Sequence, residues 1–254
     1  GTDAVRYFVS GEREDETGLL EIPQCERRRL DTLNLPLHDW TERPNALGKT
    51  SVRANINAAV SPKLDIQATT GFINIAQRFS LESNATAGLG SQAFGGPGCK
   101  VCAPDRLVGT GILATPLYGY RAWTPGYTWQ EKAGQRVNRF IGSFQANWRP
   151  TSWLQNRMTL GNDYSNRVDD NLLLRGEGPP ITALYRLGFK QNTRTDIRNF
   201  TVDLGPTASY TPMPWLALKT TGGVQYINYL FELGSALGTQ LAPGAQTAGA
   251  GAVP

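Results

Sequence analysis

The sequence predicts an all-β protein, an antiparallel transmembrane β-barrel segment of about seven meander strands that forms an incomplete barrel with long extracellular loops. Three segments alternate polar and apolar residues, reach a short turn marked by proline, and leave it in a second alternating run. Each arm has about the length of a tilted strand that crosses a bilayer. Aromatic residues close to the turns point the same way, because membrane interfaces hold such rings.

The first predicted strand runs from Ala4 to Glu14, with Val5, Tyr7 and Val9 on one side. Its hairpin partner would precede Gly1, and even the smallest single-chain bacterial barrels have about eight strands. We therefore expect residues 1–234 to be an internal part of a larger barrel. Residues 235–254 are rich in glycine, alanine and proline, so they are expected to form a loop or a disordered tail.

The first predicted hairpin runs from Ser51 to Val60, turns at Ser61-Pro62-Lys63, and returns from Leu64 to Phe72. Successive strand side chains point to opposite faces, so its apolar and polar residues are predicted to separate. The second hairpin has arms 139–149 and 153–164 around Pro150, and the third has arms 200–211 and 215–230 around Pro212. Both separate their residues in the same way.

The polar face of these hairpins would line a water-filled lumen, while the apolar face would contact lipid. These polar side chains could instead simply be solvated or pair with their neighbours. The candidate lumen-facing residues are Arg53, Asn55, Asp65, Gln67, Asn147, Arg157, Asp203, Lys219 and Gln225.

Aromatic residues decide between a membrane barrel and a soluble sheet, since both alternate. Trp148, Trp153, Tyr210 and Trp215 lie within two or three residues of the short turns, as expected for rings in a headgroup belt. The composition agrees, with 40% hydrophobic and 18% charged residues and no apolar run long enough for a transmembrane helix. The net charge of +4 is scattered along the chain, which argues against a nucleic-acid partner.

Three long connections are expected on the extracellular side, at Asp15–Thr50, Gln77–Asn138 and Asn166–Ile197, and the proline turns on the periplasmic side. The middle connection holds an aromatic cluster that could stack on sugar rings or contact a partner protein. Packing of the loop on itself is the alternative. The cluster consists of Tyr118, Tyr120, Trp123, Tyr127 and Trp129.

Several short motifs, in their order along the chain, are similar to the barrel of TonB-dependent outer-membrane receptors of the SusC/RagA type. They are Arg6-Tyr7-Phe8-Val9-Ser10-Gly11 followed by 14–18, Ser51-Val52-Arg53-Ala54-Asn55, Asn138-Arg139-Phe140-Ile141-Gly142, and Gly161-Asn162-Asp163. The resemblance implies a bacterial outer-membrane importer of an oligosaccharide, peptide or similar nutrient. It also implies that the full-length parent works with a SusD-like lipoprotein outside and with TonB in the periplasm.

Cys99 and Cys102 form a C-x-x-C pair in the middle connection. Zinc would need two further ligands, and only Cys25 and His38 remain, so we predict a local disulfide and no metal site. Free thiols are the alternative for this pair.

No enzyme is predicted, because His38 is the only imidazole and no nucleophile motif accompanies it. No cofactor-binding fingerprint is present either. The alternative function is a soluble extracellular β-rich carbohydrate-binding module, which would need a second sheet over the apolar face. The residues that discriminate the two are Val52, Ile56, Phe144, Leu160, Leu204 and Leu218.

Overall fold

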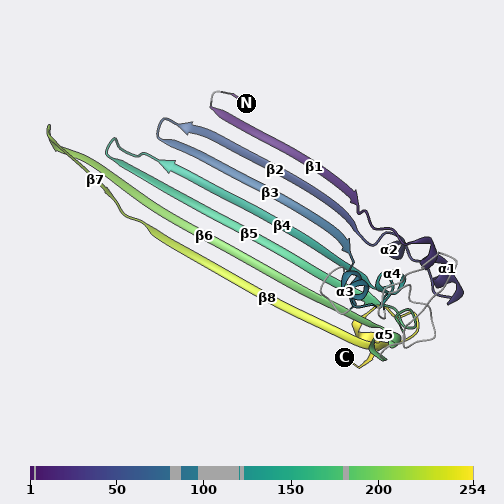
Figure 1. Cartoon of the computed structure of the whole chain (residues 1–254). Helices are drawn as coiled ribbons and strands as arrows, with labels where there is room; N and C mark the ends of the chain where they lie inside the picture. Colours follow the sequence, from purple (N-terminus) through teal and green to yellow (C-terminus); the bar gives the residue numbers. More distant parts are fainter. Residues whose placement is uncertain (3, 81–86, 97–119, 121–122, 180–182, 254) are drawn as a thin grey trace.

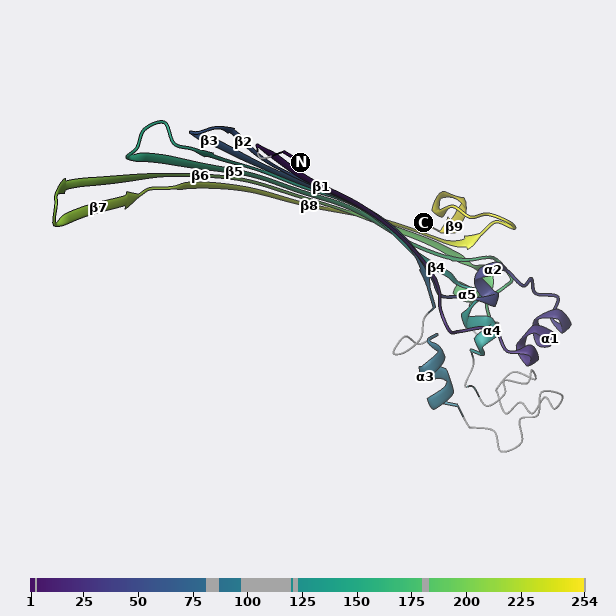
Figure 2. The same cartoon turned by 90° about the horizontal axis from the view of Figure 1, so that it is seen from above.

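The chain forms one open antiparallel sheet in a computed structural model that describes residues 1–2, 4–80, 87–96, 120, 123–179 and 183–253. The strand order is β1-β2-β3-β4-β5-β6-β8-β9, and β7 pairs with the end of β6. Figure 1 shows the strands side by side, with hairpin turns at one end and the helices at the other. Figure 2 shows that the sheet is a single layer. The predicted fold class is confirmed.

Seven long strands build this sheet within the described residues, in agreement with the predicted number. They are β1 (Val5–Thr17), β2 (Ala46–Ser61), β3 (Leu64–Phe79), β4 (Lys132–Trp148), β5 (Leu154–Leu173), β6 (Phe189–Met213) and β8 (Val224–Leu241). The short elements are β7 (Leu216–Thr221), β9 (Gly251–Val253), α1 (Gln24–Thr32), α2 (Asp39–Glu42), α3 (Leu89–Phe94), α4 (Pro125–Thr128), α5 (Ala183–Leu187) and the 3-10 helix η1 (Ala248–Ala250).

The three proline turns join β2 to β3, β4 to β5, and β6 to β7, as the sequence predicts. Hydrogen bonds also link the first turn to the second and link the second hairpin to β6. The Arg149 amide donates to the Lys63 carbonyl at 2.7 Å, and Lys63 Nζ donates to the Pro150 carbonyl at 2.8 Å. The Ser209 amide donates to the Trp153 carbonyl at 2.7 Å. These contacts hold the turn end of the sheet together.

The register separates apolar from polar side chains across the whole sheet, because residues directly opposite in an antiparallel pair point to the same face. One row of opposite residues across the seven long strands is apolar. The neighbouring row, one residue along each strand, is polar. The apolar row is Tyr7, Ile56, Ala68, Phe144, Leu160, Val202 and Tyr226. The polar row is Arg6, Asn57, Gln67, Gln145, Thr159, Asp203 and Gln225. We call the two sides the apolar face and the polar face.

The strands extend well beyond the predicted arms, so the predicted loop boundaries were wrong. β6 has 25 residues, whereas about 9–11 suffice to cross a bilayer. The connections expected at Asp15–Thr50, Gln77–Asn138 and Asn166–Ile197 shorten to 18–45, 80–131 and 174–188.

Polar pairs between neighbouring strands explain these extensions. Asn74 Nδ2 donates to Asn138 Oδ1 at 2.7 Å, and Asn166 Nδ2 donates to Asp196 Oδ1 at 2.7 Å. On the other face, Gln135 Nε2 donates to Asp169 Oδ1 at 2.7 Å. Both faces are thus partly polar toward the helical end, and alternating hydrophobicity cannot identify such strands.

The segment predicted as a tail, 235–254, is also largely ordered into the sheet. β8 continues to Leu241, which is fully buried, and Ser235 lies opposite Thr193 of β6 with their hydroxyls 2.9 Å apart. η1 and β9 then return to pair with the end of β8. Backbone pairing with β6 imposes the strand here, so a composition rich in small residues does not prevent it.

The buried hydrophobic residues gather at the helical end of the sheet, in the connections and on the adjoining strand ends, which contribute Ala133, Leu172, Leu173, Phe189 and Leu241. We call the connections 18–45, 80–131 and 174–188 the loop layer. Its described buried residues form two clusters, one of Ile22, Leu30 and Trp129 and one of Ala87, Trp123 and Tyr127. The first joins the first two connections, and Tyr185 of α5 packs against the second.

A buried ion pair fastens α1 to α4 inside the loop layer. The side chains of Glu26 and Arg29 are only 1% and 2% exposed, with Arg29 Nη2 3.0 Å from Glu26 Oε2. The same oxygen accepts from Thr124 Oγ1 at 2.7 Å and from the Gly126 amide at 2.9 Å. The Arg29 guanidinium also lies 4.3 Å from the ring centre of Tyr127. Among the described residues, each charge is compensated by the other, by Thr124 and by α4.

We expect Glu26→Ala to destabilise the loop layer by about 3 to 5 kcal/mol, because it leaves the Arg29 charge buried and without its carboxylate. Hydrogen exchange of the amides in α1 and α4 measures this local free energy. Glu21→Ala is the matched control, since Glu21 pairs with Arg43 while both side chains are 53% exposed. It should cost at most about 1 kcal/mol. Equal protection factors in the two variants would contradict the role assigned to the buried pair.

Candidate functional site

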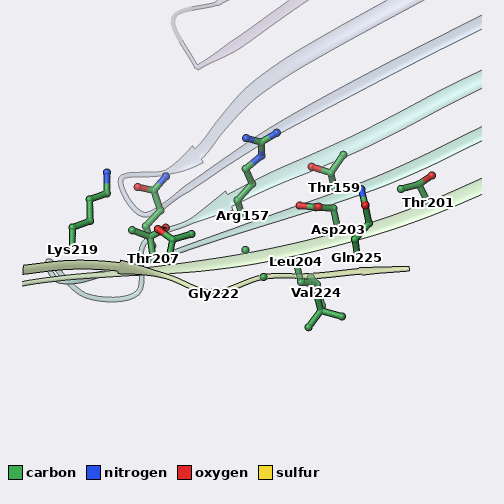
Figure 3. A pocket seen from close by; sticks show the side chains of 14 residues that line it. Arg157, Thr159, Thr201, Asp203, Leu204, Thr207, Lys219, Gly222, Val224 and Gln225 are labelled. Carbon is green, nitrogen blue, oxygen red and sulfur yellow. Dashed lines mark hydrogen bonds between the residues drawn. The ribbon is translucent and has the colours of Figure 1, made fainter. Parts of the chain in front are cut away.

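The polar face is the candidate functional surface, and the register places all nine predicted lumen-facing residues on it. Gln67 and Asp65 on β3 lie opposite Gln145 and Asn147 on β4, and Asn147 lies opposite Arg157 on β5. Figure 3 shows the end of this face near the turns, where Arg157, Asp203 and Lys219 extend to one side of the sheet. Val224 points to the other side.

A notch of about 860 Å³ lies on the polar face near the third hairpin turn. Gly205 lies opposite Arg157, and Gly222 and Gly223 connect β7 to β8 beside it. Three neighbouring positions therefore carry no side chain, which leaves the hollow open down to the backbone. The polar side chains around it include Gln155, Arg157, Asp203, Thr207, Lys219 and Gln225.

The charges in this notch have no partners within the described part of the chain. Arg157, Asp203 and Lys219 make no hydrogen bond or ion pair there. The predicted lumen residue Asp65 differs, because Arg149 Nη1 donates to its Oδ2 at 2.6 Å. Asp65 thus pairs with a neighbour, whereas Arg157, Asp203 and Lys219 have no such pairing in the described part of the chain. Arg157 and Lys219 are exposed and can meet a ligand.

Sequence reasoning named Arg157, Asp203, Lys219 and Gln225 but missed the notch itself. The signal that could have revealed it is glycine placement. Gly205 occupies a polar-face position of the third hairpin, and Gly222-Gly223 interrupts the arm that was predicted to be one strand.

The aromatic cluster predicted to contact a ligand or partner forms part of the loop-layer core instead. Trp123, Tyr127 and Trp129 are 2%, 4% and 3% exposed, so they offer no platform for a sugar ring or a partner. Trp123 also packs edge-on against Tyr185 with ring centres 4.5 Å apart. Loop self-packing, the alternative reading, is therefore correct for these three rings.

The fourth ring of that cluster is partly buried as well, and the fifth lies outside the described residues. Burial raises the pKa of the Tyr120 phenol, with smaller contributions from Glu26 and Cys25. Tyr118 cannot be assigned a contact because it is outside the described part of the chain. Cys99 and Cys102 also lie outside it, so their disulfide stays a prediction.

The single histidine joins two connections of the loop layer. His38 Nε2 lies 3.0 Å from Glu177 Oε2, and its ring stacks on Trp40 with centres 4.1 Å apart. Trp40 Nε1 donates to the Gln130 carbonyl at 3.2 Å. Among the residues that the structure covers, no group of three or more His, Cys, Asp or Glu side chains could hold a metal ion. No described helix is both long and apolar enough to cross a membrane.

Comparisons with known proteins give a match in structure alone. No model of a known protein family matches the chain, and no curated protein matches it. Among solved structures it is similar to a chain of the RagAB peptide transporter, with a TM-score of 0.66 and 12% identity over the whole of this chain. It is also similar to a chain of the RagAB peptide importer in its "open-open" state, with a TM-score of 0.64 and 12% identity.

The match covers only part of those proteins. This chain spans about a quarter of their length, 26% and 25% in the two structures. The likeness shows that the open sheet has the fold of part of a transporter chain. At 12% identity it carries no residue-level assignment.

Glu131 lies where the loop layer meets the sheet, directly before β4, and is 8% exposed. Burial raises the pKa of its carboxyl group from 4.5 to about 7. The folded loop layer therefore favours the protonated form. Its stability is greatest below the ordinary pKa of a glutamate and decreases as the pH rises toward 7.

We expect Glu131→Gln to remove this pH dependence and to stabilise the loop layer at pH 8 by on the order of 3 kcal/mol. Hydrogen exchange between pH 4 and 8, corrected for the intrinsic pH dependence of exchange, measures the difference. Comparing the variant with the unmodified protein at each pH cancels the contributions that the two proteins share. A difference that does not change with pH would contradict the assignment.

Proposed function

We propose that this chain is part of the wall, with the adjoining outer loops, of a bacterial outer-membrane importer for peptides or similar nutrients. The observation that carries the proposal is a pair of aromatic girdles that bracket an exposed apolar face. At one border Phe72, Phe140 and Tyr164 lie opposite one another on β3, β4 and β5. At the other border, near the turns, lie Trp148, Trp153, Tyr210 and Trp215, which are 51 to 78% exposed.

The spacing of the girdles fits a membrane. On β6 the apolar face runs from Phe200 to Tyr210, ten residues or about 34 Å along the strand. A strand tilt of ~40° reduces this to a height of about 26 Å. The apolar band of outer-membrane barrels is about 25 Å tall and has aromatic girdles at both interfaces.

The soluble alternative required a second sheet, and the described part of the chain contains none over the apolar face. Val52, Ile56, Leu204 and Leu218 remain 44 to 49% exposed. Phe144 and Leu160 are less exposed, and they lie opposite each other within the same layer. An apolar face this large in water would be an aggregation site, whereas hydrocarbon would cover it.

In this orientation the turns face the periplasm, the loop layer lies outside the cell, and the polar face lines the passage. A peptide is favoured over an oligosaccharide as the cargo, since the similar solved chains belong to a peptide transporter. The full-length parent would act with TonB and with a SusD-like lipoprotein at the loop layer, and outer-membrane lipid would contact the apolar face. No cofactor or catalytic step is required.

We expect Leu204→Arg to destabilise the full-length barrel by about 2 to 4 kcal/mol, because it places a charge near the middle of the lipid-facing band between Phe200 and Tyr210. Thr201→Arg is the matched control on the same strand, since its side chain lies on the polar face. It should have little effect. Unfolding titrations in lipid vesicles compare the two, and equal losses would refute the assignment of the faces.

We further expect cells that express the full-length protein to accumulate labelled peptides of about ten residues, and cells without it to lose this uptake. Dissipating the proton-motive force should abolish the accumulation, because TonB-linked import consumes it. Uptake that is unaffected by deletion of the gene would overturn the proposed function. A comparison with labelled oligosaccharides of similar mass identifies the cargo class.

A further inference from the structure

We propose that the notch between β5 and β8 binds carboxylate groups of acidic peptides through Arg157 and Lys219. This inference rests on the proposed function, since it names the substrate that the polar face would accept. A volume of about 860 Å³ is in the range of binding sites for small ligands and accommodates several peptide residues.

The notch is accessible down to its backbone floor. A Cβ atom added at Gly222 would meet no atom within 4 Å, and one added at Gly205 would first meet the Gly222 carbonyl oxygen at 3.9 Å. Neither position has a positive φ. The hollow is thus open space beside Arg157, and its two glycines can accept side chains without steric conflict.

The charge of the notch favours an anion. It contains two cations, Arg157 and Lys219, and one carboxylate, Asp203, and none of them has a partner among the described residues. Elsewhere on the sheet cations next to aspartates do pair, as Arg139 does with Asp163 at 2.6 Å and Lys190 with Asp170 at 2.5 Å. Arg6 and Arg53, farther along the polar face, also have no partner in the described part of the chain. The surface therefore keeps uncompensated positive charge.

The chemistry of the lining selects a carboxylate on a peptide. A guanidinium binds a carboxylate with two parallel hydrogen bonds, and an ammonium adds a second point of attraction. The amides of Gln155 and Gln225 can both donate to and accept from a peptide backbone. The hydroxyl of Thr207 already pairs with that of Thr221 at 3.0 Å, and the pair keeps acceptor capacity for a ligand. Neutral sugars would leave both cations without a counter-charge. Lipid headgroups are excluded because the notch opens on the face opposite the apolar face.

The test uses the full-length importer in cells and two peptides that differ only in three Glu-to-Gln replacements. We expect the Glu peptide to compete for uptake about tenfold better, or by about 1.4 kcal/mol, because its carboxylates form charge-assisted hydrogen bonds with the two cations. The double variant Arg157→Gln and Lys219→Gln should lose this preference while it still takes up the Gln peptide. Arg149→Gln is the matched control, because it removes a cation that already pairs with Asp65. It should keep the preference.

A second variant, Gly205→Leu, fills the notch without changing its charge. We expect it to reduce uptake of the Glu peptide more than that of the Gln peptide. An unchanged preference in the double variant, with uptake intact, overturns the inference and leaves the proposed function standing. The inference is also overturned if the double variant admits a large antibiotic while its preference for the Glu peptide is unchanged. The two cations would then contact another part of the importer and not the peptide. Absence of all peptide uptake by the unmodified protein overturns both.

Discussion

Backbone hydrogen bonds between neighbouring strands fix one register across seven long strands, and every surface of the molecule depends on it. A slip of one residue between any two strands would turn one strand's apolar side chains onto the polar face. Rows such as Ile56, Ala68 and Phe144 would then no longer be continuous. The proline turns oppose such a slip, because each joins two strands over a short connection and hydrogen bonds link the first turn to the second.

The protein separates its two uses of hydrophobic residues. In the loop layer, Leu30, Trp123 and Trp129 are buried among one another, as in a water-soluble domain. On the sheet, apolar side chains of similar size remain exposed on one face. The buried Glu26–Arg29 pair belongs to the first region, where a fixed partner on α4 compensates its desolvation.

The hairpins and their faces could be predicted because alternation with a period of two survives wherever one face is polar and the other apolar. Prediction failed where this contrast fades. Near the helical end, polar pairs lie on the face that is apolar nearer the turns. They include the pair made by Asn138 and the pair of Asn166 with Asp196, so these strand ends were predicted to be loops. The burial of Trp123 and Trp129 depends on contacts between distant segments, and composition cannot show it. The notch depends on glycines that become neighbours only through the register.

β6 extends well beyond the aromatic girdle of Phe72, Phe140 and Tyr164, toward the loop layer, and this length limits which peptides could span it. Phe189, at its outer end beside the loop layer, and Gly205, at the floor of the notch, are sixteen residues or about 54 Å apart along the strand. An extended chain gains at most about 3.6 Å per residue. In a peptide importer, cargo shorter than about fifteen residues could not touch both ends of this path at once. If the chain lines a peptide importer as proposed, such cargo would meet the two ends of the path one after the other.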